Sequence, residues 1–463
     1  MDVSAITCTG DRPVQFDICL RIMDRMNPKP NQWIIVDDGR IPIDKDIIPQ
    51  SATYIRREPN KQDYPMTLSL NMLEAYPHIK YNKLIFIEDD DWYPVNYMSK
   101  MIKESNGYDV YGSSRRRFFN LKLDSYYEFI KGWESITASM ILNSRKAINF
   151  WFDICKKYLD GNGLDTYFWK EFNGSKKTIP HNLNAMSIGI KGWRVGRSGG
   201  YAPSHNGDFG YSKDTDRAKL QNWIGGDFNW YSQDNINPKL NFVIYSPPYK
   251  NCSAGIRVLY KLADMLNGLG HTAICTDKEP NIQDNFIVIY PEIVKGNPWN
   301  AKNVVRYYLN VAGKLGGNEI NDASEMMVGY SKQFGNFKDS EILFIDVFNG
   351  FDYSYEEKYI ESCFWIGKGK YVDCDCIKDS IEITRTYPHT REELAVLLKR
   401  TKVFYSFDYC TGLTEEAKRA GCKVYYIING IPEEVDVDSD FSKEKLQLEI
   451  FIYRCQKFIR ENK

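Results

Sequence analysis

The sequence predicts an α/β protein that contains several parallel sheets, and three observations favour this class. Short apolar runs, typical of buried strands, alternate with amphipathic stretches, typical of helices. The first-half runs over 33–36 and 83–87 end abruptly in acidic residues, where α/β sheets bind ligands. The chain has 463 residues, of which 43% are hydrophobic. At about 100–200 residues per domain, this predicts roughly three compact units.

The first elements follow a strand, turn, helix, strand order. An apolar run over 3–6 predicts the first strand, and the run over 33–36 predicts the second. A helix is expected around 65–76. The apolar run over 83–87 predicts a third buried strand, which ends in the acidic residues 88–91. Ligands are therefore expected at the carboxyl ends of these strands.

The middle of the chain is less regular. Residues 111–235 are rich in glycine, tryptophan, tyrosine and asparagine. Glycine-containing stretches at 189–192 and 198–200 indicate irregular loops around a site. The polar stretch 231–239 is typical of a linker.

A second series of α/β elements follows this linker. The expected elements are strands at 240–245, 271–275, 285–290, 341–348, 402–407 and 423–428, and helices at 256–266, 391–400, 414–420 and 442–463. The pattern predicts three domains, over 1–235, 240–360 and 361–463.

Net charge, hydropathy and cysteine content exclude some classes of partner and favour one cellular compartment. The net charge of −1 argues against a chain that wraps nucleic acid by bulk electrostatics, although residues 111–220 alone carry +8. No apolar stretch could span a bilayer, and residues 1–4 do not resemble a secretory signal. We therefore expect a cytoplasmic protein. Its 11 cysteines are expected to be reduced, including the one close pair, Cys374 and Cys376.

Four consecutive acids at a strand end, Glu88 to Asp91, repel one another, and a divalent cation would relieve that repulsion. Mg²⁺ and Mn²⁺ prefer carboxylate and phosphate oxygens. A metal that bridges a diphosphate would neutralise a leaving group as a sugar–phosphate bond breaks. The alternative is a solvated acidic turn.

Three segments, at 6–13, 34–39 and 84–94, resemble a GT-A glycosyltransferase of the family-2 type in order and spacing. The resemblance covers about residues 1–235 and implies a nucleotide-sugar donor. It implies that Asp37 or Asp38 contacts the base or ribose, and that Thr9 and Arg12 lie near the nucleotide.

The acidic cluster resembles the DxD element of that family in two frames. Glu88-x-Asp90-Asp91 fits one form with Glu in the first place, and Asp89-x-Asp91 fits the literal pattern. The resemblance implies that Asp90 and Asp91 contact Mn²⁺ or Mg²⁺, and that Asp89 contacts the nucleotide sugar.

The resemblance also implies a base and a further metal ligand. An inverting transferase needs a carboxylate base, and Asp165 stands where one is expected, although a helix cap is the alternative. His205 resembles the late histidine that completes the metal shell, with a loop hydrogen-bonding role as the alternative. Trp133 and Glu134 are expected to be a core residue beside a surface residue, with a role in shaping the acceptor side as the alternative.

The second half resembles a GT-B glycosyltransferase, with two Rossmann-like domains and glycine-containing loops that open helices. The segment 404–422 is the best match. The resemblance implies that Gly255 binds the nucleotide sugar and that Thr411, Gly412 and Leu413 offer backbone N–H groups to the diphosphate. It also implies that Lys368 binds phosphate and that Glu416 holds the donor ribose. The alternative is an α/β domain with no ligand.

Together these features predict a glycosyltransferase, an enzyme that is metal-dependent in its GT-A domain and metal-independent in its GT-B part, and so bifunctional. A UDP-sugar is the expected donor. The alternative is a sugar-nucleotide-binding scaffold with one active module or none.

The basic middle suggests the acceptor. Arg115, Arg116 and Arg117 beside Phe118 and Phe119 suit a polyanion, such as DNA with hydroxylated bases or a phosphorylated lipid carrier. A solvated face is the alternative for these residues. A glycan precursor is an equally ordinary acceptor.

Overall fold

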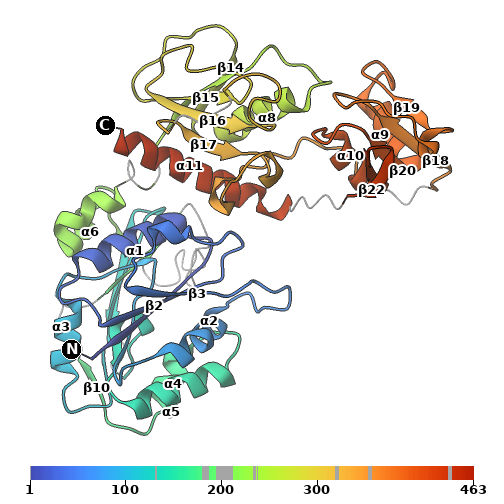
Figure 1. Ribbon diagram of the computed structural model, residues 1–463. Coiled ribbons are helices and arrows are strands. Elements are labelled where there is room, and N and C mark those ends of the chain that lie inside the picture. Colours follow the sequence, from blue (N-terminus) through green and yellow to red (C-terminus); the bar gives the residue numbers. More distant parts are fainter. Residues whose placement is uncertain are drawn as a thin grey trace. The chain divides into compact units, whose positions relative to one another are not determined.

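The computed structural model describes residues 2–130, 133–179, 187–193, 212–232, 236, 238–318, 323–352, 357–435 and 441–462. The described chain is an α/β protein, as predicted. It divides into two compact units, Met1–Pro238 and Lys239–Lys463 (Figure 1). The three predicted domain ranges stay predictions.

In the part of the first unit that the structure describes, a seven-stranded sheet has the order β10-β6-β9-β4-β1-β2-β3. Strands β4, β1, β2 and β3 are parallel, and β9 runs antiparallel to β4 and β6. The strands are β1 (Ser4–Thr9), β2 (Gln32–Asp37), β3 (Ala52–Arg56), β4 (Leu84–Phe86), β6 (Val110–Ser113), β9 (Met140–Leu142) and β10 (Lys176–Ile179).

Helices α2 (Leu68–Ala75), α4 (Arg145–Lys157) and α5 (Leu164–Glu171) lie together in Figure 1. They share one core with the apolar residues of β1, β2 and β4, centred on Trp151, Phe152 and Phe168. Ser144 caps α4, because its side chain accepts the N–H of Ala147. Helix α1 (Pro13–Arg25) starts at a proline, which the first helical turn tolerates.

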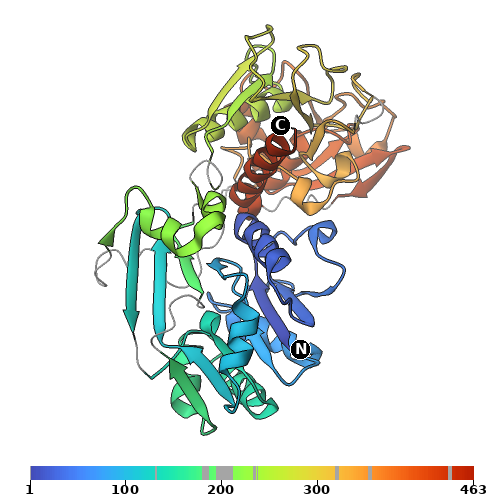
Figure 2. The ribbon, with the colours of Figure 1, turned by 90° about the vertical axis from the view of Figure 1, so that its left-hand side faces the viewer.

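A second sheet of the first unit has the order β12-β8-β7-β11-β5 among the described strands. Its strands are β5 (Asp91–Trp92), β7 (Arg115–Asn120), β8 (Ser125–Ile130), β11 (Ile188–Lys191) and β12 (Ser212–Lys213), and Figure 2 shows β7 and β8 side by side. The expectation of an irregular loop at 189–192 was wrong for residues 189–191. These form β11, because Gly189 lets the ring of Phe118 pack where a Cβ would lie 2.3 Å from it.

The second unit contains two further sheets within its described residues, in the orders β14-β13-β15-β16-β17 and β19-β18-β20-β21-β22. All strands of the first are parallel, and in the second only β22 is antiparallel. The strands are β13 (Asn241–Tyr245), β14 (Thr272–Thr276), β15 (Phe286–Pro291), β16 (Asn303–Tyr308), β17 (Met326–Gly329), β18 (Ile360–Trp365), β19 (Ile381–Ile383), β20 (Thr401–Ser406), β21 (Lys423–Ile428) and β22 (Ile431–Glu434). The predicted strand at 341–348 is absent from this fully described stretch, and β17 takes the outer place in the sheet.

Four helices of the second unit are α8 (Ala254–Gly268), α9 (Arg391–Arg400), α10 (Leu413–Arg419) and α11 (Glu444–Glu461). Helix α11, dark red in Figure 2, follows the second sheet in the sequence, yet it packs on the first. Its residues Leu448, Phe451, Ile452 and Cys455 share a core with β13, β15 and α8.

One cysteine expectation was wrong, because Cys374 and Cys376 form a disulfide. They flank Asp375, with Cys374 as the N-cap of a short 3-10 helix, Asp375–Ile377, that contains Cys376. The remaining nine cysteines have free thiols. Among the described helices, none has the length and apolar character needed to cross a bilayer.

Candidate functional site

The acidic cluster, Glu88 to Asp91, lies at the carboxyl edge of the first sheet. Strand β4 ends at Phe86, the cluster follows, and β5 begins at Asp91. Asp89, Asp90 and Asp91 are 2–4% exposed. Because β4, β1 and β2 are adjacent and parallel, the residues that end these three strands lie near one another. The solvated-turn alternative is therefore wrong for these three aspartates.

Thr9 ends β1, and Arg12 follows it across a short turn. Nη1 of Arg12 lies 2.6 Å from Oδ1 of Asp89, in a largely buried ion pair. Gly10 permits this turn to approach the end of β2, because a Cβ there would lie 2.3 Å from Oδ1 of Asp38. The structure thus brings four of the predicted site residues to one edge of the sheet: Thr9, Arg12, Asp38 and Asp89.

Asp37 and Asp38 are held by protein groups. The carboxylate of Asp37 accepts the N–H groups of Gly39 and Ile43 at 2.9 Å and the hydroxyl of Tyr54 at 2.7 Å. Asp38 pairs with Arg57 at 2.9 Å and accepts the hydroxyl of Thr67.

These bonds shape the loop after β2. Burial raises the pKa of Asp37, even though its bonds with Ile43, Gly39 and Tyr54 act in the opposite direction. The role of Asp37 and Asp38 in binding a base or ribose stays a prediction.

Lys191 is a second cation of the acidic cluster, beside Arg12, and it was not predicted from the sequence. Strand β11 pairs antiparallel with β5, with Gly189 opposite Asp91. This register places Nζ of Lys191 3.1 Å from Oδ2 of Asp90 and 3.2 Å from Oδ1 of Asp91. The N–H of Ile190 adds a bond to Asp91 at 3.3 Å. A lone lysine between glycines was the available signal, but nothing in the sequence gave its strand partner.

Burial dominates the electrostatics of the cluster. It raises the pKa of Asp91 to about 7, despite the nearby ammonium of Lys191. Burial and the charges of Asp91, Asp90 and Asp165 also raise the pKa of Glu88. Burial alone would raise the pKa of Asp90 too, but Lys191 and Arg12 hold it below its usual value.

The donor set suits a hard divalent cation. Single ligand oxygens of Glu88, Asp90 and Asp91 lie within 4.8 Å of one another. The four carboxyl groups of the cluster face two cations, Arg12 and Lys191. With Lys191 displaced, full ionisation would leave three negative charges beside Arg12 among the described residues, and a divalent ion would offset two of them. We conclude that the cluster fits Mg²⁺ or Mn²⁺, provided that Lys191 gives way.

Asp165 lies in the first turn of α5, and its negative charge contributes to the raised pKa of Glu88. The capping residue of α5 is Gly163, in the left-handed conformation. Oδ1 of Asp165 accepts the N–H of the next residue, Thr166, at 2.8 Å. Asp165 is therefore not the cap itself, and its role as a base stays a prediction.

Three other predictions had different outcomes. His205 lies outside the described residues. The expectation for Trp133 and Glu134 was wrong, because Trp133 is 51% exposed while Glu134 is fully buried. Asp89, predicted to contact the nucleotide sugar, is bonded to Arg12, and its predicted contact stays untested by the geometry.

The basic segment of β7 is partly neutralised. Arg115 and Arg117 both donate to Oε1 of Glu128 on β8, at 2.6 and 2.9 Å. The guanidinium of Arg117 also lies over the ring of Trp223, 5.0 Å from its centroid. Burial alone would raise the pKa of Glu128, but these two arginines hold it below its usual value. The charge of these two arginines is therefore partly neutralised by Glu128 within the fold.

Predicted residues of the second unit meet where α8 and α10 begin. A Cβ at Gly412 would lie 3.3 Å from the Cβ of Ala254, the residue before Gly255. The carboxylate of Glu416 is 2% exposed and pairs with Arg257 at 2.9 Å and with Arg391 at 2.8 Å.

The loop at the start of α10 is also held within the fold. The hydroxyl of Thr411 accepts the N–H of Leu413 at 3.3 Å. The roles of Gly255, Glu416 and this loop in binding a donor stay predictions.

Glu292 is a second buried charged residue that was not predicted from the sequence. It follows β15, is 3% exposed, and accepts the N–H of Leu309 at 3.0 Å. Burial raises its pKa to about 7, while the charge of Lys368 acts in the opposite direction. A Cβ at Gly255 would lie 3.5 Å from the side chain of Leu309, so Glu292 is near the start of α8.

The position of Glu292 has topological meaning. Strand β13 has β14 on one side and β15 on the other, which makes the carboxyl edge between β13 and β15 a switch point of the sheet. Strand β18 has the same place in the other sheet, and the N–H of Lys368 after it donates to Asp408 after β20 at 3.1 Å.

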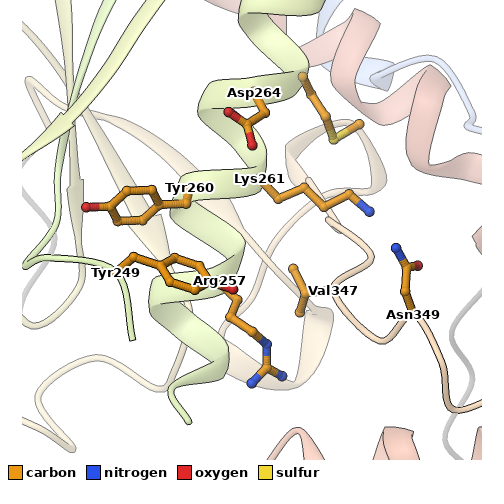
Figure 3. Close-up of a pocket in the computed structure, with 8 residues that line it drawn as sticks. Tyr249, Arg257, Tyr260, Lys261, Asp264, Val347 and Asn349 are labelled. Carbon is orange, nitrogen blue, oxygen red and sulfur yellow. The ribbon is translucent and has the colours of Figure 1, made fainter. Parts of the chain in front are cut away.

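A cavity of about 450 Å³ lies along α8 (Figure 3). Its lining consists of Tyr249, Arg257, Tyr260, Lys261, Asp264, Met265, Val347 and Asn349. Arg257 and Lys261 point into this region in Figure 3, but both are engaged, Arg257 by Glu416 and Lys261 by the carbonyl of Asp346. None of the six predicted residues of the second unit lines it.

A scan against protein families and a search of curated proteins found no match. Among solved structures, HddC from Yersinia pseudotuberculosis is 16% identical, with a TM-score of 0.28, over 39% of this chain and 90% of its own. A TarS fragment from S. aureus in complex with UDP is 10% identical, with a TM-score of 0.31, over 41% of this chain and 60% of its own. The 4-diphosphocytidyl-2C-methyl-D-erythritol synthase of Anaerococcus prevotii is 11% identical, with a TM-score of 0.27, over 39% and 86%.

Proposed function

We propose that the first unit is a glycosyltransferase that moves a sugar from a nucleotide-sugar donor, a UDP-sugar in the first instance, to an acceptor hydroxyl. One observation carries this proposal. Glu88, Asp90 and Asp91 converge at the carboxyl edge of a largely parallel sheet, where such sheets bind ligands. The charge of Asp165 reaches the same cluster.

The proposed reaction is a single displacement. The bond from the anomeric carbon to the diphosphate oxygen breaks, and its electron pair stays on the diphosphate. The acceptor oxygen forms the new bond, and its proton passes to the carboxylate of Asp165. Arg12, which pairs with Asp89, keeps a positive charge at the carboxyl edge of the sheet, where the nucleotide would bind. A divalent cation held by Glu88, Asp90 and Asp91, when bound, would offset the charge of the diphosphate.

Hydrolysis of a panel of UDP-sugars by the full chain with Mn²⁺ tests this proposal without an acceptor. We expect slow hydrolysis of one donor, and a loss of about 100-fold in Asp90→Asn. Asp153→Asn is the matched control, because Asp153 is exposed on α4 and pairs with Lys156. A wild type that binds a UDP-sugar without turnover would support the alternative, a sugar-nucleotide-binding scaffold. Equal rates in both variants would contradict the proposal.

The second unit is the candidate for a second, metal-independent transfer. The observation that favours it is the buried carboxyl group of Glu292 at a topological switch point, near Lys368. We infer that this strand edge binds a sugar nucleotide and that Glu292 can exchange a proton there. Two transfers by one chain would suit consecutive additions to one acceptor, through a high effective concentration.

The acceptor is either a glycan or lipid-linked precursor or DNA with hydroxylated bases. Arg115 and Arg117 favour an anionic acceptor, although Glu128 offsets part of their charge. Retention of the full chain on DNA at low salt, lost as the salt concentration rises, would support the nucleic-acid version. No retention at low salt would remove it. A cytoplasmic location is part of the proposal, and fractionation of expressing cells tests it.

A further inference from the structure

Lys191 occupies the position that a metal ion would need. Its side chain is 9% exposed, and its Nζ lies 3.1 Å from Asp90 and 3.2 Å from Asp91. These are two of the three carboxylates that could hold a cation. An ammonium and a divalent ion on the same oxygens would repel each other strongly in a buried site.

The backbone that carries Lys191 is fixed, so any exchange has to involve its side chain. The carbonyl of Lys191 accepts the N–H of Leu121 at 2.8 Å. Gly192 turns directly against Asn120, and a Cβ there would lie 2.1 Å from Oδ1 of that residue. Strand pairing with β5 adds a third restraint. Lysine has a long, flexible stem that can move its charge by several ångströms without moving the strand.

We propose that Lys191 is a resident counter-ion that excludes the divalent cation until the donor binds. In this account the cation and the ammonium are alternative partners of Asp90 and Asp91. The displaced ammonium moves to the donor diphosphate, which is the strongest anion expected at this edge. This inference rests on the proposed function for its second half only, because the exclusion itself concerns the free protein.

The consequence is a positive coupling between metal and nucleotide. Without nucleotide, the divalent cation has to displace Lys191 with no new partner for the ammonium, so it binds weakly. With UDP, the ammonium gains a phosphate partner, and the cation binds more tightly. A coupling of about tenfold is expected, which is typical of linked sites. Lys191 is thus a positioning residue for the metal and the donor.

The test measures free Mn²⁺ by electron paramagnetic resonance during titration of the full chain, with and without UDP. Wild type is expected to bind Mn²⁺ weakly alone and about tenfold more tightly with UDP. Lys191→Met is expected to bind Mn²⁺ at least tenfold more tightly than wild type without UDP, and to lose most of the coupling. Lys191→Arg keeps a counter-ion and is expected to bind Mn²⁺ as weakly as wild type.

Two controls make the result specific. Lys103→Met removes an exposed lysine of α3 (Tyr97–Glu104) and should leave Mn²⁺ binding unchanged. Asp90→Asn in the Lys191→Met background should abolish the tight Mn²⁺ binding, which assigns it to this cluster. Circular dichroism of each variant verifies that the chain is folded.

The inference is overturned if Lys191→Met, folded by circular dichroism, binds Mn²⁺ no more tightly than wild type, including the case in which neither binds it. Should Lys191→Met fail to fold, the inference then stands or falls on wild type and Lys191→Arg, where an absence of coupling between Mn²⁺ and UDP overturns it. Failure of the proposed function looks different. In that case UDP binds to no variant, with or without Mn²⁺, while the nucleotide-free comparison still decides the exclusion.

Discussion

Within the described residues of the first unit, Arg12 and Lys191 pair with aspartates of the acidic cluster, which holds four carboxyl groups, from Glu88 to Asp91. Burial raises the pKa of Asp91 and of Glu88, and carboxyl groups with pKa values shifted in this way cluster at functional sites. The four acids are predictable from the sequence because they are contiguous. The pairing of Lys191 with Asp91 is not, because 100 residues separate these partners and the register of β11 and β5 joins them.

Asp165 is expected to act in catalysis and not in donor binding. Replacement of Asp165 by Asn removes the proposed proton acceptor and keeps nearly the same volume. We predict that kcat for transfer falls by about 100-fold or more, while the affinity for UDP changes little. Steady-state kinetics and UDP titration measure the two effects. A variant that transfers sugar at the wild-type rate would rule Asp165 out as the base.

Glu292 is expected to make stability depend on pH. Its folded-state pKa of about 7 lies above its ordinary value, so folding favours its protonated form. Its favourable contribution is present at low pH and is lost as the pH rises through about 7. We therefore predict that Glu292→Gln and wild type unfold alike near pH 4.

Near pH 8 the same Glu292→Gln variant should be the more stable protein, by up to about 3 kcal/mol. Urea unfolding at the two pH values, followed by the second unit's transition, measures the difference. Glu279→Gln is the control, because Glu279 is exposed. An equal difference at both pH values would contradict the assigned burial effect.

At the scale of elements, the close approach of β1 and β2 depends on Gly10. A Cβ there would lie 2.3 Å from Asp38 and 2.9 Å from the backbone nitrogen of Gly39. We predict that Gly10→Ala lowers the stability of the first unit by about 1–3 kcal/mol. Gly226→Ala is the matched control, because a Cβ at Gly226 meets nothing within 4 Å.

Thermal unfolding of the two glycine variants checks this prediction. The melting temperature of Gly10→Ala should fall. The free energy of unfolding of Gly226→Ala should stay within about 0.5 kcal/mol of the wild-type value. If Gly10→Ala is as stable as wild type, the strand edge tolerates a wider turn than the structure indicates.

The elements that sequence predicted best are the buried strands. Strands β2 and β4 are built on continuous apolar runs, and that signal is local. The run at 341–348 has the same local signal but forms no strand, because its apolar side chains pack as a loop, with Leu343 and Ile345 in the core beside α11. For β11 the error is the reverse, because a predicted loop forms a strand. Glycine favours a loop in the sequence, and the packing of the Phe118 ring against Gly189 is visible only in the structure.

The burial of Trp133 and Glu134 could not be predicted from the local sequence either. Hydrophobicity predicts a buried Trp133 and an exposed Glu134, and the structure reverses both. Burial of an acid depends on tertiary partners that no local pattern encodes. The same reason applies to Glu292, whose buried position follows from the fold of the switch point.

At the scale of the whole molecule, the two units are expected to carry separable chemistry. Asp90→Asn should abolish Mn²⁺-dependent turnover in the first unit. Glu416→Gln should leave that turnover intact, because Glu416 and its partners Arg257 and Arg391 all belong to the second unit. Product analysis by mass spectrometry distinguishes the bonds formed.

Glu392→Gln is the control for Glu416→Gln, because Glu392 is exposed on α9. The proposal of two transfers fails if Asp90→Asn and Glu416→Gln abolish the same glycosidic bond. Loss of the Mn²⁺-dependent reaction in Glu416→Gln alone would assign all turnover to the second unit.

The central claim is that the acidic cluster of the first unit binds a metal–nucleotide donor. Crystals of the full chain grown with UDP and Mn²⁺ would test it directly, through anomalous scattering from manganese. We predict an anomalous peak at coordination distance from the carboxylates of Glu88, Asp90 and Asp91, with Lys191 turned away from them. Bound UDP with no manganese at these carboxylates, or with Lys191 still on Asp90 and Asp91, would contradict the account.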